Sequence, residues 1–234
     1  MRPVDIIVPV YNEEACIEEF HARMARLGLS SALVFVDNGS TDGTAARIAR
    51  LPDVRLIRHA QNEGYGASVR DAMLAGTADR IVIIDGDLEY PPEVVPAVLQ
   101  ALDRHPVVYT SRFVARGRVE LPLFRRLGNR AVSGLYNALF RQHVTDLLTG
   151  CKGFRRGVVT PDALHADGFE HSIEFGVLFA LGGQTIAEVP VAYVPRTRGT
   201  SKMRHVPEAA RMVAALVRYW VRYVALGRSV PHGA

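Results

Sequence analysis

Short runs of apolar residues alternate along the chain with segments in which apolar residues recur every three or four positions. An apolar run of about four to eight residues is typical of a buried strand, and the longer spacing indicates a helix with one buried face. Predicted strands cover residues 4–10, 32–36, 54–58 and 80–84, and predicted helices cover residues 13–27, 42–51 and 66–75. This alternation predicts an α/β fold, with a mostly parallel sheet that helices cover on both faces.

The second half of the chain has a more mixed pattern. We predict strands at residues 107–111 and 185–194, and helices at residues 123–140, 170–181 and 207–227. Residues 196–205 are polar and basic and show no periodicity, which favours a mobile loop. The pattern therefore predicts one domain over residues 1–206, followed by a helix and tail over residues 207–234.

Composition narrows the class of protein. The chain has 234 residues, of which 48% are hydrophobic and 22% charged, so it can bury one sizeable core. Its formal net charge of +4 suits phosphates, nucleic acid or an anionic membrane surface and does not choose between them. The only cysteines, Cys16 and Cys151, form no disulfide framework or CxxC motif, which fits a reducing cytoplasm. No stretch reaches the length of about 18 uncharged apolar residues that spans a bilayer.

Acidic and turn residues gather where three of the predicted strands end. The first strand ends in the letters PVYNE from Pro9, the second in DNGSTD from Asp37, and the fourth in DGD from Asp85. In open α/β sheets, ligands bind outside the carboxyl ends of the strands. Each segment alone also fits an ordinary turn or helix cap, but the three together favour a binding site.

The segment after the fourth strand predicts a divalent metal ion. Asp85 and Asp87 follow an apolar strand with one glycine, Gly86, between them, and Glu89 comes two residues later. Carboxylates this close repel each other unless a cation lies between them, and oxygen ligands suit Mg²⁺ or Mn²⁺. An Asp-Gly turn at a strand end is the alternative. A dinucleotide fingerprint at residues 62–68 is excluded, because Val69 stands where its last glycine is needed.

Taken in order, these segments resemble a known family. The letters VPVYNEE, VDNGSTDGT, NEGYGASVR and IIDGDLEYPPE are similar to family 2 glycosyltransferases of the GT-A fold. The later letters TSRF, LGNR, TGCKGFR, EVPV and GTSKM resemble the subgroup of dolichol-phosphate mannosyltransferases and other polyprenyl-phosphate glycosyltransferases. The resemblance covers nearly the whole chain and implies that residues 1–206 form a GT-A glycosyltransferase domain.

The resemblance also implies how a nucleotide-sugar donor is held. The matching positions are Pro9, Tyr11 and Glu13 for the nucleoside, Asp37 for the base or ribose, Asp85 and Gly86 beside the ribose and diphosphate, and Asp87 and Glu89 for the metal. The family motif usually reads Asp-Ala-Asp-Leu-Gln, whereas this chain reads Asp-Gly-Asp-Leu-Glu. The added carboxylate still suits a divalent ion and leaves the choice between Mg²⁺ and Mn²⁺ open.

A second set of positions is implied for phosphates and catalysis. They are Arg112, Arg116 and Arg118 as a basic cradle, Ser201 and Lys202 in a closing loop, and Glu174 as an acid near the acceptor. Arginine offers a planar fork to phosphate oxygens, and lysine offers a point charge. If the acceptor were a hydroxyl, Glu174 or Asp146 would be the candidate base.

The last predicted helix bears on the membrane. Arg211, Arg218 and Arg222 fall in one stripe at helical spacing, and Trp220 lies among the apolar positions with two tyrosines. A basic stripe beside an apolar face suits an amphipathic helix at a membrane interface, which predicts a cytoplasmic protein held peripherally on the inner face of the membrane. The alternative is a helix packed on its own domain or on a partner subunit.

The sequence thus predicts a metal-dependent, inverting hexosyltransferase that moves a sugar from a UDP- or GDP-sugar to a polyprenyl phosphate, without a nucleic-acid partner. Two alternatives stay open: a soluble family 2 enzyme that acts on a hydroxyl of a small molecule, saccharide or protein, and a nucleotide-sugar-binding or regulatory protein without turnover. The donor base, the sugar and the oligomeric state are not encoded in the motifs.

Overall fold

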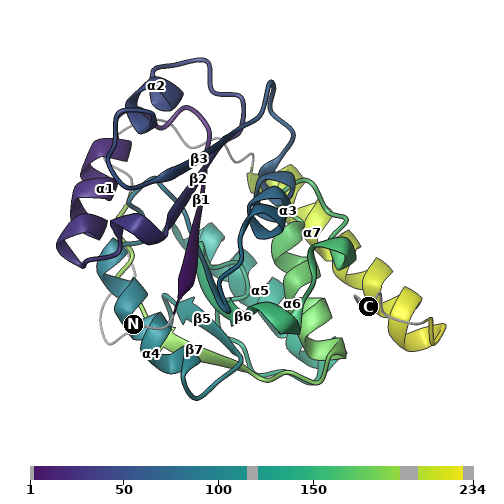
Figure 1. The fold of residues 1–234 in the computed structure, drawn as a ribbon. Coiled ribbons are helices and arrows are strands. Elements are labelled where there is room, and N and C mark those ends of the chain that lie inside the picture. Colours follow the sequence, from purple (N-terminus) through teal and green to yellow (C-terminus); the bar gives the residue numbers. More distant parts are fainter. Residues whose placement is uncertain (1–2, 115–120, 196–204, 229–234) are drawn as a thin grey trace.

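The strands of the chain form one twisted sheet (Figure 1). The computed structural model describes residues 3–114, 121–195 and 205–228. Within them the sheet has seven strands in the order β3-β2-β1-β4-β6-β5-β7. Their bounds are β1 Val4–Val10, β2 Leu33–Asp37, β3 Arg55–Arg58, β4 Arg80–Ile84, β5 Val107–Ser111, β6 Cys151–Arg155 and β7 Ile186–Pro190.

One strand runs against the others. β6 lies between β4 and β5 and is antiparallel to both, with Lys152 opposite Ile83, while the remaining neighbours in the sheet are parallel. The start of β6 therefore lies at the same edge of the sheet as the carboxyl ends of its parallel neighbours. This edge is where ligands bind in open α/β sheets.

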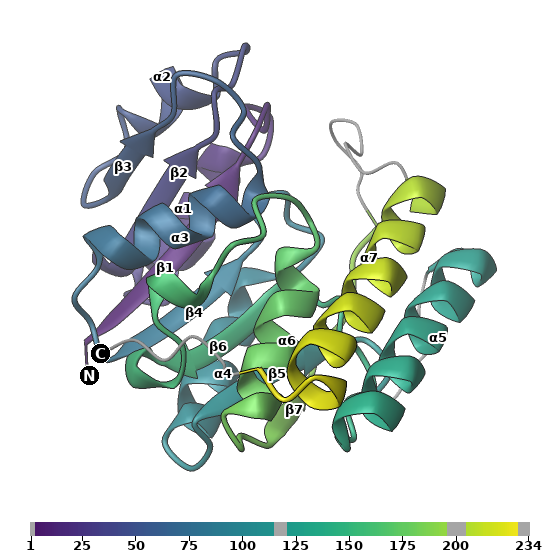
Figure 2. The ribbon, with the colours of Figure 1, turned by 90° about the vertical axis from the view of Figure 1, so that its right-hand side faces the viewer.

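Helices cover both faces of the sheet (Figures 1 and 2). The side chains of each central strand alternate between two cores, so that Ile7 faces one core while Ile6 and Val8 face the other. α1, α2 and α4 pack on the second core, and α3, α5, α6 and α7 pack on the first. The helices are α1 Ile17–Arg26, α2 Thr44–Ile48, α3 Tyr65–Ala75, α4 Val95–Leu102, α5 Leu123–Phe140, α6 His171–Leu181 and α7 His205–Tyr219, and one wider turn follows α7 at Trp220–Ala225.

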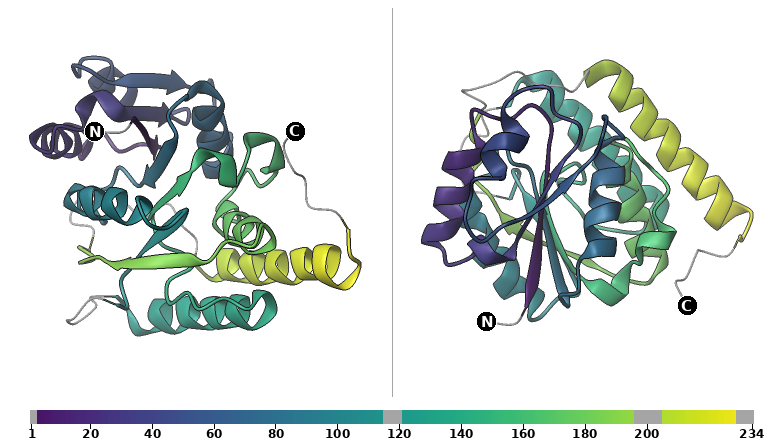
Figure 3. Two further views of the ribbon diagram at one scale, coloured as in Figure 1. Left: turned by 60° about the horizontal axis from the view of Figure 1, so that its bottom comes forward. Right: turned by 45° about the horizontal axis from the view of Figure 1, so that its top comes forward.

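The last helix belongs to the same core as the helices beside it. α7 lies next to α5 and α6 on the outside of the molecule (Figure 3). Met212, Ala215, Leu216 and Tyr223 are buried in the core that α5 and α6 also line. Among the described residues, no helix has the length and the apolar character needed to cross a bilayer.

The predicted α/β fold with a mostly parallel sheet is confirmed, and two elements were missed. β6 was not predicted because Lys152 and Gly153 interrupt its apolar pattern, although both are buried in the folded chain. α4 was not predicted because Pro96 stands near its start, where proline is compatible with a first helical turn. α1 begins at Ile17, later than predicted, because the residues before it form a turn. Most of the predicted loop at residues 196–205 lies outside the described residues.

A glycine on α3 sets how closely the chain can approach that helix. A Cβ at Gly66 would lie 1.9 Å from the carbonyl oxygen of Ala166, and the Gly66 amide already donates to the Asp167 carbonyl at 2.7 Å. We therefore expect Gly66→Ala to lower the free energy of unfolding by roughly 1–3 kcal/mol, because the backbone must shift. Gly134→Ala on α5 is the matched control, since its Cβ meets no atom within 4 Å. It is expected to gain up to about 1 kcal/mol. Chemical denaturation measures both, and equal effects would contradict the account.

Candidate functional site

A cavity of about 770 Å³ opens at the carboxyl edge of the sheet. This volume is in the range of small-molecule and cofactor sites. Its walls come from the ends of β1, β2 and β4, from the start of β6, and from α5, α6 and α7. Eight residues predicted for the site line it: Pro9, Tyr11, Glu13, Asp85, Gly86, Asp87, Glu89 and Arg112. The structure therefore brings together residues that lie up to about a hundred positions apart in the sequence.

The loops after β1 and β2 are tied together by hydrogen bonds. The Asn12 amide donates to Ser40 Oγ at 2.9 Å, and the Thr41 amide donates to Asn12 Oδ1 at 2.7 Å. Asn12 has a φ of 55°, in the left-handed region that asparagine tolerates better than most residues. The Glu13 amide donates to Thr44 Oγ1 at 2.9 Å. These contacts fix the end of the cavity where Pro9 and Tyr11 lie.

Asn38, and not Asp37, faces the cavity at this end. Asp37 is buried, and its Oδ1 accepts a hydrogen bond from the Ser40 amide at 3.2 Å, so that it holds the turn. Asn38 lines the cavity and is held by the Glu63 amide and by Asn62, at 2.8 and 3.1 Å. The predicted contact between Asp37 and the donor stays a prediction, and Asn38 is a lining residue that motif matching missed.

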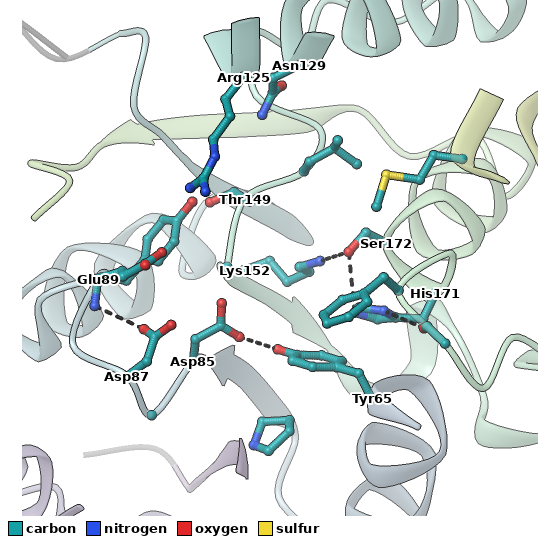
Figure 4. A pocket seen from close by; sticks show the side chains of 18 of the residues that line it. Tyr65, Asp85, Asp87, Glu89, Arg125, Asn129, Thr149, Lys152, His171 and Ser172 are labelled. Atoms are coloured by element: carbon teal, nitrogen blue, oxygen red, sulfur yellow. Dashed lines mark hydrogen bonds between the residues drawn. The ribbon is translucent and has the colours of Figure 1, made fainter. Parts of the chain in front are cut away.

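Asp85 lies in the centre of the cavity wall (Figure 4). Its Oδ1 accepts a hydrogen bond from the Tyr65 hydroxyl at 2.6 Å. Burial, and then the charge of Asp87, raises the pKa of Asp85 to about 7. Gly150 makes room for this carboxylate, since a Cβ there would lie 2.1 Å from Asp85 Oδ2. The carboxylate thus lies half-buried on the cavity wall, close in sequence to a second acid.

The backbone turns at Leu88, between Asp87 and Glu89. Leu88 has a φ of 64°, which is rare for a residue with a large side chain and is often found at functional sites. The Glu89 amide donates to Asp87 Oδ1 at 2.9 Å, and the Tyr193 hydroxyl donates to Glu89 Oε2 at 3.0 Å. Two carboxylates on the cavity wall fit Mg²⁺ or Mn²⁺, which proteins commonly hold with one or two carboxylates plus substrate phosphates.

A different group of three side chains is spaced closely enough to bind a metal ion. Possible ligand atoms of His59, Glu63 and Asp71 lie within 4.8 Å of one another. Within the described ranges, this is the only group of three or more histidine, cysteine, aspartate or glutamate side chains with such spacing. His59 Nε2 lies 3.1 Å from Asp71 Oδ2. None of the three lines the cavity.

Arg112 reaches the cavity already paired with an acid. Its Nε and Nη2 donate to the two oxygens of Asp146 at 2.7 and 2.8 Å, and Asn129 donates to the same carboxylate at 2.8 Å. The rings of Tyr90 and Tyr193 lie 5.7 and 5.6 Å from its guanidinium carbon. The positive charge of Arg112 is therefore largely balanced within the protein.

Glu174 lies on α6, as predicted, but its carboxylate is held by hydrogen bonds away from the cavity wall. Its buried carboxylate accepts hydrogen bonds from the amides of His165 and Ala166 at 2.9 and 3.0 Å and from the Tyr219 hydroxyl at 2.8 Å. It is not a lining residue of the cavity. Glu174 thus joins α6, the loop before it and α7, because a buried carboxylate needs such donors. Its predicted role near the acceptor stays a prediction.

The structure adds lining residues that the prediction did not include. Arg125 and Asn129 come from α5, Lys152 from β6, and His171 and Ser172 from the start of α6 (Figure 4). Asn129 and Lys152 lie in the matching segments LGNR and TGCKGFR, whereas Arg125, His171 and Ser172 lie in none of the matching segments. Four predicted residues, Arg116, Arg118, Ser201 and Lys202, lie outside the described residues, and their roles stay predictions.

Comparison with known proteins gives one family and two groups of similar proteins. The family model "Glycosyl transferase family 2" matches residues 5–160. A dolichyl-phosphate hexose transferase of Haloferax volcanii is 33% identical over 83% of this chain and 84% of its own length. A dolichol-phosphate mannosyltransferase of Pyrococcus furiosus is 30% identical over 86% of this chain, which spans 59% of that longer protein.

The solved structures include glucosyl-3-phosphoglycerate synthase from Mycobacterium tuberculosis. Its complex with UDP is 25% identical, with a TM-score of 0.71 over 94% of this chain and 80% of that one. A further complex of that synthase contains Mn²⁺, UDP and glucosyl-3-phosphoglycerate. At 24% identity and a TM-score of 0.68, the latter likeness establishes the fold.

The Arg112–Asp146 pair provides a stability test. Removal of one partner leaves a buried charge uncompensated, so we expect Arg112→Met or Asp146→Leu to lower the free energy of unfolding by about 3–5 kcal/mol each. The double variant R112M/D146L removes both charges and should lose clearly less than the sum of the single losses. Chemical denaturation of the four proteins measures this, and strictly additive losses would contradict the pairing.

Proposed function

Because the chain belongs to glycosyl transferase family 2, we propose that it transfers a sugar from a nucleoside-diphosphate donor to a polyprenyl phosphate, with inversion at the anomeric carbon. The single observation that carries this proposal is the layout of the cavity. Lining residues from β1 and β2 occupy one end, the acids after β4 occupy the middle, and Arg125 and Asn129 on α5 occupy the other end. This order matches a nucleoside, a diphosphate with its metal, and an anionic acceptor.

The donor end has groups that suit each part of a nucleotide. Pro9, Tyr11 and Asn38 offer apolar surface and an amide to a nucleoside. Asp87 and Glu89 would hold Mg²⁺ or Mn²⁺, which as a Lewis acid stabilises the charge of the departing diphosphate. The choice between the two ions, and between UDP and GDP, is left to the donor panel described below.

The acceptor end favours a phosphate over a hydroxyl. A phosphate oxygen is already anionic at neutral pH and needs positioning more than a base. Both candidate bases, Glu174 and Asp146, are buried, and each carboxylate already accepts a hydrogen bond from a backbone amide, that of His165 and that of Arg112 respectively. Arg125 offers a guanidinium on the cavity wall that suits a phosphate. The resemblance to the family supports phosphate binding by Arg116, Arg118, Ser201 and Lys202 as well.

The reaction follows from this placement. A phosphate oxygen of the acceptor attacks the anomeric carbon, and the bond from that carbon to the diphosphate oxygen breaks. The electron pair leaves with the nucleoside diphosphate, so that no proton has to be removed from the acceptor. Attack opposite to the leaving group inverts the configuration.

An exposed apolar surface next to the cavity supports delivery of the acceptor from a membrane. On α5, Leu123, Phe124 and Leu127 are 70, 60 and 58% exposed, and Phe124 also lines the cavity. On the neighbouring α7, Val213 and Val217 are exposed, and further along the chain so are Val221 and Val224. Large apolar patches of this kind mark interaction sites. We propose that this surface lies in the interface of the membrane, with the exposed Arg211, Arg218 and Arg222 near lipid headgroups.

The experiment that tests the function is a donor panel. The protein is incubated with UDP- and GDP-sugars, Mg²⁺ or Mn²⁺, and a short polyprenyl phosphate, and release of nucleoside diphosphate is followed. We expect release from one donor that depends on the lipid phosphate. Release that depends instead on a water-soluble hydroxyl acceptor would overturn the proposed acceptor, and absence of binding of every donor would overturn the proposed donor.

Asp87→Ala is expected to abolish metal-dependent donor binding, because it removes a ligand of the ion between protein and diphosphate. Titration calorimetry with and without a chelator measures the effect. Asp71→Ala is the matched control, since Asp71 is also an acid but belongs to the cluster outside the cavity. Loss of metal-dependent binding in the Asp71 variant, with binding retained in the Asp87 variant, would show that the ion binds at the cluster outside the cavity and would contradict the proposal.

Leu127→Glu and Val217→Glu are expected to reduce co-sedimentation with anionic vesicles severalfold, because each puts a charge into the proposed membrane surface. Leu74→Glu on α3 is the control, since Leu74 is 62% exposed but lies on another helix. If all three variants bind vesicles as the unmodified protein does, the proposed surface is wrong.

A further inference from the structure

Lys152 is a buried lysine on the wall of the cavity. Its side chain starts from β6 and is among the largest fully buried side chains, with 1% of the residue exposed. The antiparallel direction of β6 brings it to the same sheet edge as the acids after β4. A lysine is almost never fully buried unless its charge has partners, so its presence calls for an explanation.

The described protein groups provide only some of the hydrogen-bond and charge partners that the Lys152 ammonium group can use. Among the residues that the structure describes, Lys152 Nζ makes one hydrogen bond, to Ser172 Oγ at 3.2 Å. The ring of Tyr109 lies 5.5 Å from Nζ. Asp85 is the acid with the largest electrostatic effect on Lys152, although the described residues include no ion pair of Lys152 within 4.0 Å. An ammonium has three N–H donors, so the group can bind further oxygen atoms in the cavity.

Neighbouring side chains hold the lysine in this place. Ser172 Oγ lies 3.3 Å from His171 Nε2, and the His171 ring stacks on Tyr65 at 4.4 Å. Tyr65 in turn donates to Asp85 (Figure 4). Burial lowers the pKa of Lys152 to about 8, while the charge of Asp85 opposes this shift. The side chains thus form a continuous, oriented wall between the central acids and α6.

The position of Lys152 and Ser172 along the cavity indicates which part of the substrate they contact. In a nucleotide sugar, the sugar follows the diphosphate, so in the proposed function it lies beyond the metal-binding acids and before the acceptor phosphate. Lys152 and Ser172 lie in that interval, between Asp85 and the residues of α5 (Figure 4). Sugar hydroxyls offer the oxygen acceptors that the ammonium needs.

We propose that Lys152, oriented by Ser172, donates a hydrogen bond to a ring hydroxyl of the donor sugar and thereby selects which sugar is transferred. This inference rests on the proposed function and adds a specificity-determining residue to it. Asp85 lies on the other side of the same interval and is available to accept from a neighbouring hydroxyl.

The first test compares nucleotides with and without the sugar. Affinities of UDP, GDP, UDP-glucose and GDP-mannose are measured by calorimetry for the unmodified protein, for Lys152→Met and for Ser172→Ala. We expect the Lys152 variant to bind the nucleoside diphosphate within about twofold of the unmodified protein, and to bind the nucleotide sugar roughly ten- to hundredfold more weakly. Ser172→Ala changes fewer atoms, and we expect it to show a smaller loss of the same kind. It therefore still tests the inference if Lys152→Met does not fold.

The second test identifies the hydroxyl. Donors that lack one ring hydroxyl at a time are compared between the unmodified protein and the variants, so that protein and ligand form a double-mutant cycle. We expect one deoxy donor to bind the unmodified protein as weakly as the complete donor binds the Lys152 variant, with no further loss when both changes are combined. A purely structural role of Lys152 would give additive losses for every deoxy donor, which would overturn the inference.

The two proposals fail in different ways. If nucleoside diphosphates and nucleotide sugars bind but lose affinity equally in both variants, Lys152 does not contact the sugar, and the proposed function stands. If the unmodified protein binds none of these nucleotides or their sugars, the proposed function itself is contradicted.

Discussion

The site depends on how buried negative charge is balanced at the carboxyl edge of the sheet. Asp85 and Asp87 follow β4 with only Gly86 between them, and both are half-buried on the cavity wall. Two carboxylates this close repel each other unless positive charge lies nearby. Lys152 lines the same cavity as Asp85, and in the proposed function a divalent ion at Asp87 and Glu89 adds further positive charge. A substrate that carries a diphosphate and its metal completes this balance, so charge alone already favours an anionic, metal-bound ligand.

The antiparallel strand makes this arrangement possible. β6 enters the sheet from the edge where its neighbours end, so Gly150 and Lys152 lie against the acids after β4. Because Gly150 has no side chain, the carboxylate of Asp85 can lie against it. Two residues later, the long side chain of Lys152 supplies a positive charge. Asp146 accepts hydrogen bonds from Arg112 and Asn129 and thereby connects the end of β5 to α5. Phe124, one of the exposed apolar residues of α5, also lines the cavity, which relates the cavity to the surface proposed for the membrane.

The sequence predicted the parts of the site that local motifs encode. Alternating apolar runs located the parallel strands, and polar segments at their ends located Pro9, Tyr11, Asp87 and Glu89 on one cavity. It did not predict β6, because a buried lysine and a glycine interrupt the apolar pattern. Nor did it distinguish Asn38, which faces the cavity, from Asp37, which holds a turn, because neighbours in a sequence can point in opposite directions. Glu174 shows the same limit, since only tertiary contacts reveal that Tyr219 and two amides use its carboxylate.

The most direct measurement is a crystal structure of the protein with a nucleotide sugar and Mn²⁺, in which anomalous scattering locates the ion. We expect an ion held by Asp87 and Glu89, a nucleoside between the ends of β1 and β2, and a sugar between the acids and Arg125. An ion at His59, Glu63 and Asp71 instead, with the nucleotide outside the cavity, would contradict this expectation.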